Sequence, residues 1–143
     1  MTAEQTDTAI KTLHVAKEIT IAAPPAIVFE TLLQPHGPLA EMKMKLEAWP
    51  GGRWFRDLGD NTGHLWGHVQ VIKPPKVLEL VGQMMMSYPA LNHIQYRLTE
   101  TPGGTLLSFT HKAIGLIEPG LEANVSGGWQ QNLEAIRTAA EKA

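Results

Sequence analysis

The sequence predicts an α+β domain in which a curved antiparallel sheet of six to seven strands wraps round one long C-terminal helix. Three observations predict it: alternating apolar residues near the start, a succession of strand-like segments in the middle, and a helical apolar stripe at the end. An antiparallel sheet needs cover on only one face, and one long amphipathic helix supplies it. Because a strongly twisted sheet and a helix do not touch along their full length, we expect a cavity between them.

The first strand is predicted from residue 12 onward, because apolar and polar residues alternate there as in a half-buried strand. Lys17 is the one exception on the apolar face, which otherwise holds Leu13, Val15, Ile19 and Ile21. Pro24-Pro25 breaks the strand and favours a helix start, so one or two short helices are expected before the next strand. Residues 1–11 are expected to form a flexible leader to a single domain over residues 12–143.

The clearest hairpin joins residues 93–100 to residues 105–112 through Thr101-Pro102-Gly103-Gly104. Any register that closes this turn with two or four loop residues places even positions of one strand opposite odd positions of the other. One face then collects the apolar side chains together with one histidine: Ile94, Tyr96, Leu98, Leu107, Phe109 and His111.

The end of the chain changes to helical periodicity. Apolar residues recur every three or four positions, at Leu121, Val125, Trp129, Leu133, Ile136 and Ala140. Gly127-Gly128 lies inside this stripe and costs a helix about 1 kcal/mol per glycine relative to alanine. The pair therefore indicates either a close approach to another backbone or a helix that begins later, capped by Ser126.

Composition excludes several classes of protein. The chain has 143 residues, 43% of them hydrophobic and 18% charged, which is typical of one globular domain. Twelve Lys and Arg against fourteen Asp and Glu give a formal charge of −2, which argues against nucleic-acid and membrane partners. The absence of cysteine excludes disulfides and thiol nucleophiles. Since the N-terminus does not read as a signal peptide, we expect a cytoplasmic protein. We also expect no cofactor.

Several segments, by their order and spacing, resemble one known family. They are Glu18-Ile19-Thr20-Ile21-Ala22-Ala23-Pro24 with Val28-Phe29, Trp49-Pro50-Gly51-Gly52-Arg53-Trp54, Gly67-His68-Val69, Ile72-Lys73-Pro74-Pro75-Lys76-Val77-Leu78, and Gly128-Trp129. Over residues 14–141 the chain resembles the START-like or SRPBCC superfamily, and within it the branch of heat-shock-protein-90 ATPase activator homologues. The resemblance implies a helix-grip fold. It also implies a place among domains that are mostly ligand-binding or uncharacterised, in a superfamily that includes lipid carriers and aromatic polyketide cyclases.

We expect the cavity to bind a small hydrophobic or aromatic molecule. The residues expected to line it are Trp66, Met85, Tyr96, Phe109, His111 and Trp129. Since His111 and Tyr96 share one hairpin face, an alternative is an enzyme of the cyclase, hydratase or lyase kind that uses this pair as acid and base. The sequence leans against an enzyme, however, and assigns no catalytic residue. A third interpretation is an interaction module, chaperone-related or joined as a homodimer through Met84-Met85-Met86.

His64 and His68 have the spacing of a helical zinc pair, but they lie in a predicted strand. At ~3.3 Å per residue they stand about 13 Å apart, too far to share one ion, so no metal site is expected. The sequence pattern of the predicted strand 64–72 leaves open which of its two faces points inward. Its apolar face, with Leu65 and Val69, is favoured for the core, and the face with His64, Trp66 and His68 for the outside; the opposite assignment would bring Trp66 into the cavity.

Overall fold

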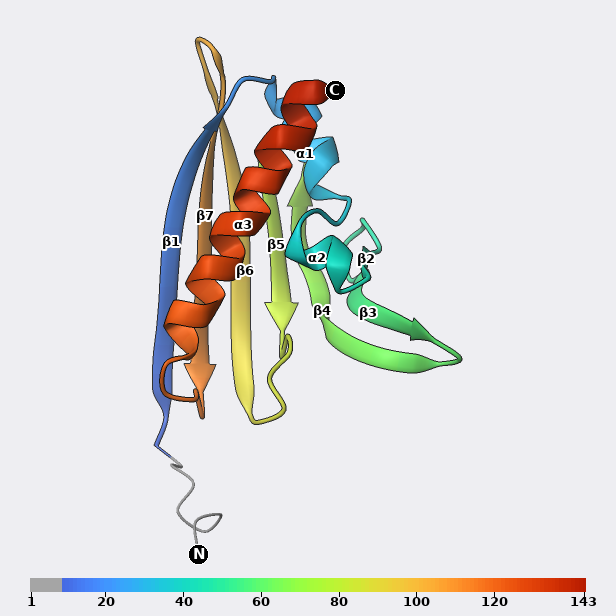
Figure 1. The fold of residues 1–143 in the computed structure, drawn as a ribbon, viewed down its shortest axis with the longest axis vertical. Coiled ribbons are helices and arrows are strands. Elements are labelled where there is room, and N and C mark those ends of the chain that lie inside the picture. Colours follow the sequence, from blue (N-terminus) through green and yellow to red (C-terminus); the bar gives the residue numbers. More distant parts are fainter. Residues whose placement is uncertain (1–8) are drawn as a thin grey trace, which may run out of the picture.

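In the computed structural model, which describes residues 9–143, seven antiparallel strands form one curved sheet (Figure 1). The strands are β1 (Lys11–Ile21), β2 (Met44–Leu46), β3 (Arg53–Gly59), β4 (Thr62–Lys73), β5 (Val77–Gly82), β6 (Ala90–Thr101) and β7 (Gly104–Gly115). The helices are α1 (Pro25–Leu32), α2 (Pro38–Glu41) and α3 (Leu121–Lys142). The strand order β1-β7-β6-β5-β4-β3-β2 places the first strand beside the last. The predicted α+β architecture, with short helices after the first strand, is confirmed.

The expected leader lies largely outside the described residues, and Lys11 already belongs to β1. Within residues 9–143, no helix combines the length and the apolar character that crossing a bilayer requires.

The long helix α3 lies across one face of the sheet, as predicted (Figure 1). Its buried side chains include five members of the predicted stripe, Val125, Trp129, Leu133, Ile136 and Ala140. The helix begins at Leu121, and a Cβ atom added at Gly127 or Gly128 would meet no atom within 4 Å among residues 9–143, apart from the neighbouring backbone of the helix itself. Both sequence interpretations of the glycine pair, a close backbone approach and a later helix start, are therefore wrong.

The outer edge of β1 is tied to α3 by two carboxylates. Oε2 of Glu122 accepts a hydrogen bond from the backbone N–H of His14 at 3.3 Å, and Oε2 of Glu141 accepts one from that of Ala22 at 2.8 Å. Since β1 has a strand partner on one side only, the first bond supplies an acceptor for an N–H group along its free edge, and the second does so for Ala22, which directly follows the strand.

The predicted hairpin register is confirmed in β6 and β7. Ile94 pairs with His111, Tyr96 pairs with Phe109, and Leu98 pairs with Leu107, and all six side chains are buried. The buried face of β1 also matches its prediction.

The preferred assignment for β4 is wrong at Trp66. The side chain of Trp66 is only 3% exposed, whereas Leu65 beside it is 54% exposed. Val69 is buried as expected, and His64 and His68 are exposed as expected. Trp66 thus shares the inner face with Val69, although strict alternation would separate them.

A bulge in β4 is the physical reason. Trp54 of β3 pairs with Gly67, but the next residue, Phe55, pairs with Leu65, so Trp66 has no partner of its own. An extra residue of this kind breaks the alternation and puts two successive side-chain positions on one face. Trp66 therefore turns toward the core together with Gly67.

Candidate ligand-binding cavity

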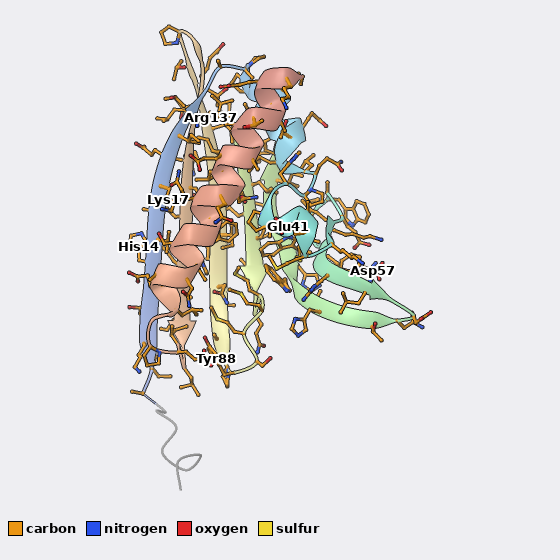
Figure 2. The ribbon with its side chains drawn as sticks, in the orientation of Figure 1. His14, Lys17, Glu41, Asp57, Tyr88 and Arg137 are labelled. Carbon is orange, nitrogen blue, oxygen red and sulfur yellow. The ribbon has the colours of Figure 1, made fainter. Side chains whose placement is uncertain are left out.

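A cavity of ≈230 Å³ lies between α2, β4 and the first half of α3. It is lined by Pro38, Leu39, Met42, Trp66, Met84, Met85, Leu121, Asn124, Val125, Gly128, Trp129 and Asn132. None of these side chains is charged. Glu41, labelled on α2 in Figure 2, is exposed and does not belong to the lining. The cavity is thus a mainly apolar space with two asparagines on its wall.

The α2 side of the cavity is held in place by contacts with α3. Gly37, which precedes Pro38 at the start of α2, has a φ of +57° in the left-handed region that favours glycine. A Cβ atom at Gly37 would lie 3.1 Å from the Cβ atom of Ala135, so a larger residue would push α2 away. In addition, Nδ2 of Asn132 donates to the carbonyl oxygen of His36 at 3.2 Å.

The opposite wall includes the methionine loop, residues 83–89, which follows β5. Nε2 of Gln83 donates to the carbonyl oxygens of Met86 at 2.8 Å and Tyr88 at 2.9 Å, so one side chain closes the loop. Met84 and Met86 are buried and Met85 is half-buried. Met84 and Met85 line the cavity, which places adaptable thioether side chains on its wall.

Trp129 lies on the α3 wall and is connected to the methionine loop through buried polar groups. Its Nε1–H donates to Nδ1 of His111 at 3.0 Å, so the His111 proton resides on Nε2, which donates to Oδ1 of Asn92 at 2.7 Å. Nδ2 of Asn92 in turn donates to the carbonyl oxygens of Gly82 and Gln83, both at 3.2 Å. Burial lowers the pKa of the His111 imidazole to about 4, which keeps the ring neutral at pH 7.

Tyr96 forms a second buried connection. Its hydroxyl donates to Oδ1 of Asn132 at 3.0 Å, and burial raises the pKa of this hydroxyl above its ordinary value of 10. The ring of Phe109 lies between two other rings, with centroids 5.1 Å from Tyr96 and 4.5 Å from Trp129. Phe109 and His111 therefore support Trp129 from behind.

Trp66 forms part of the wall on the β4 side. Its ring packs edge-to-face against Trp54, with centroids 5.1 Å apart and planes at 83°. The Nε1–H group of Trp66 is buried and has no hydrogen-bond partner among residues 9–143. An unpaired buried donor is uncommon in folded proteins.

The structure divides the six predicted site residues into two groups. Trp66, Met85 and Trp129 line the cavity. The other three do not: Phe109 and His111 lie behind Trp129, and Tyr96 lines a smaller cavity of ≈30 Å³. Because the polar atoms of His111 and Tyr96 already have protein partners, neither is placed to exchange a proton with a molecule in the larger cavity.

Sequence reasoning missed several lining residues, among them Asn132 and Gly128. Asn132 carried a signal, because it lies three residues after Trp129 and four before Ile136, on the same face of the helix. Asn92, which supports the site through His111, is likewise in phase with the buried positions of β6. Within the described part of the chain, no three His, Asp or Glu side chains are grouped so that they could hold a metal ion.

A curved antiparallel sheet that grips a long C-terminal helix, with a cavity between them, defines the class of helix-grip domains. The chain belongs to the family of activator of Hsp90 ATPase homolog 1-like proteins, whose family model matches residues 22–141. The family resemblance drawn from the sequence is therefore confirmed.

Solved structures share this fold at low sequence identity. An uncharacterised protein from Rhizobium leguminosarum has a TM-score of 0.74 and 20% identity, over 96% of this chain and 100% of that one. A protein from Chromobacterium violaceum has a TM-score of 0.70 and 21% identity, over 90% and 96%. The di-domain ARO/CYC protein StfQ of the steffimycin biosynthetic pathway has a TM-score of 0.63 and 15% identity, over 99% and 54%. No curated protein matches the chain.

Proposed function

We propose that this protein binds a small hydrophobic or aromatic molecule in the cavity between α2, β4 and α3. The observation that carries the proposal is the cavity itself, ≈230 Å³ in volume and walled by residues that include two tryptophans and three methionines. An apolar cavity of about 150 Å³ accommodates benzene, and sites for drug-sized ligands begin near 300 Å³. The volume therefore suits a molecule of one or two rings.

The arrangement of the walls supports the same conclusion. Trp129 is fixed by a hydrogen bond to His111 and by ring contact with Phe109, so its orientation is set before a ligand arrives. Preorganised aromatic surface contributes to affinity because little side-chain freedom is lost on binding. The methionines opposite adapt to the shape of the ligand. Because the formal charge is −2, we expect no nucleic-acid or membrane partner. We also expect the protein to act in the cytoplasm.

Native mass spectrometry of the purified protein, followed by titration with naphthalene, tests the proposal. A bound small molecule, or saturable quenching of tryptophan fluorescence by naphthalene, is the expected result. The matched variants are Gly128→Leu and Gly127→Leu, because Gly128 lines the cavity and exposed Gly127 does not. Gly128→Leu should weaken naphthalene binding at least tenfold, and Gly127→Leu should leave it unchanged. Absence of binding to the unmodified protein, or equal effects of the two variants, would contradict the proposal.

A further inference from the structure

We propose that the ligand of this cavity is an uncharged molecule carrying an oxygen atom that accepts a hydrogen bond from Nε1–H of Trp66. This inference rests on the proposed function and deepens it by naming the chemistry of the ligand. It is carried by two observations: the absence of charged groups from the lining, and a buried N–H group without a partner in residues 9–143 on one of the lining residues.

The lining sets the charge of the ligand. None of its twelve side chains can neutralise a carboxylate, a phosphate or an ammonium group. Two buried titratable groups near the wall, His111 and Tyr96, are neutral at pH 7 and bonded to Asn92 and Asn132. Transfer of a charge from water into such surroundings without a partner is strongly unfavourable. A fatty acid or an organic phosphate is therefore a poor fit, and an uncharged molecule is a good one.

The buried side-chain donors and acceptors of the wall have protein partners among residues 9–143, with one exception. Nε1–H of Trp129 donates to His111, and the amide of Asn132 bonds to Tyr96 and to the carbonyl oxygen of His36. Asn124 is exposed to solvent. Trp66 is the lining residue whose buried donor is left without a partner in residues 9–143.

A ligand oxygen would supply the missing partner. A hydrocarbon of the same shape would leave the Trp66 donor unpaired, and buried unpaired donors are costly. Met84 lies beside Trp66 in this wall, because its backbone N–H donates to the carbonyl oxygen of Trp66 at 2.8 Å. Methionine side chains change rotamer easily. A carbonyl, ether or phenolic oxygen on a ring system would satisfy both the apolar wall and the donor.

Three probes that share one ring system test the inference: naphthalene, 2-acetonaphthone and 2-naphthoate. We expect the ketone to bind about tenfold more tightly than naphthalene, in line with one hydrogen bond to a buried donor. We expect 2-naphthoate to bind at least tenfold more weakly than the ketone. Trp66→Phe keeps an aromatic ring and removes the N–H group, so the ketone should lose its tenfold advantage over naphthalene in this variant, whatever the change in affinity that both probes share.

Trp49→Phe is the matched control, since Trp49 is 58% exposed and lies outside the lining. A second readout uses the unmodified protein. In its NMR spectrum, the indole N–H proton resonance of Trp66 should shift downfield when the ketone binds and should not do so when naphthalene binds. Equal affinity for the ketone and naphthalene, an unchanged Trp66 resonance, or tightest binding of 2-naphthoate would overturn the inference and leave the proposed function standing. Failure of all three probes to bind would overturn both.

Discussion

Nε1–H of Trp129 donates a 3.0 Å hydrogen bond to Nδ1 of His111, and this bond determines where a fully buried histidine carries its proton. With Nδ1 acting as the acceptor, Nε2 carries the hydrogen and donates it to Asn92 at 2.7 Å. The neutral ring thus satisfies both neighbours. A second proton would turn the acceptor Nδ1 into a donor and break its bond to Trp129.

The first prediction concerns pH. The pKa of His111 is about 4 in the folded protein, against 6.5 for an unperturbed histidine. Between these values the unfolded chain binds a proton that the folded protein does not, so the free energy of unfolding should fall as the pH drops from 6.5 toward 4. The loss should be on the order of 3 kcal/mol. Urea unfolding across pH 4.5–7.5 measures it.

The matched variants for this measurement are His111→Gln and His64→Gln. The first should lack this part of the pH dependence, although it is less stable at pH 7. The second removes an exposed histidine and should retain the dependence. An identical slope in His111→Gln would show that another group titrates in this range.

The second prediction concerns the indole of Trp129. Trp129→Phe keeps most of the ring but leaves Nδ1 of buried His111 without its donor. We expect the free energy of unfolding to fall by about 1–3 kcal/mol. Trp49→Phe, at an exposed position, should change it by less than about 0.5 kcal/mol. Chemical denaturation of both variants provides the comparison, and equal stabilities would argue against a role for the Trp129 hydrogen bond.

The third prediction concerns the glycine pair in α3. Since a Cβ atom at Gly127 or Gly128 meets nothing outside the neighbouring helix backbone within 4 Å in the described part of the chain, alanine at either position should gain its helix propensity without a clash. Each substitution should raise the free energy of unfolding by about 1 kcal/mol. Thermal unfolding of Gly127→Ala and Gly128→Ala measures the gain. A loss of stability at either position would show that the helix is more tightly packed there than the structure indicates.

The fourth prediction concerns the Tyr96 hydroxyl. Tyr96→Phe removes the donor to buried Asn132 and should lower the free energy of unfolding by about 1–2 kcal/mol. Because burial raises the pKa of Tyr96 above 10, the unmodified protein and the variant should show the same phenolate absorbance at pH 10 while both remain folded. An additional ionising phenol in the unmodified protein at that pH would contradict the buried hydrogen bond.

Most of the fold could be predicted from the sequence because its signals are local. Alternation in β1, the Pro-Gly-Gly turn between β6 and β7, and the stripe on α3 each specify a face without knowledge of distant residues. The β4 bulge is different, because it depends on how β3 and β4 pair. Gly67 was a hint: a Cβ atom there would lie 2.4 Å from the carbonyl oxygen of Val81, and an isolated glycine in a strand is typical of a bulge or a close approach.

The cavity was predicted as a consequence of the fold, but its lining was predicted only in part. Of the six residues named from the sequence, Trp66, Met85 and Trp129 border this cavity, whereas Phe109 and His111 lie behind Trp129 and Tyr96 borders a smaller cavity. Tyr96, Phe109 and His111 lie on the same inner face of the sheet as Trp66, which does line the cavity. The alternation within one strand determines whether a side chain faces the inside of the sheet. Whether that side chain also borders the cavity depends on the distance between α3 and the strand, and no periodicity in the sequence encodes that distance.

The position of β1 beside β7 has a consequence for synthesis. Ile21 pairs with Thr105 and Lys11 pairs with Gly115, so β1, which is synthesised before the other strands of this sheet, has no strand partner until nearly the whole sheet has been made. Until then its apolar side, with Leu13 and Val15 among others, is open to non-native contacts. Pairings this distant along the chain slow folding. Helix α3, which is synthesised after the whole sheet, then binds His14 in β1 and Ala22 directly after it through two glutamates.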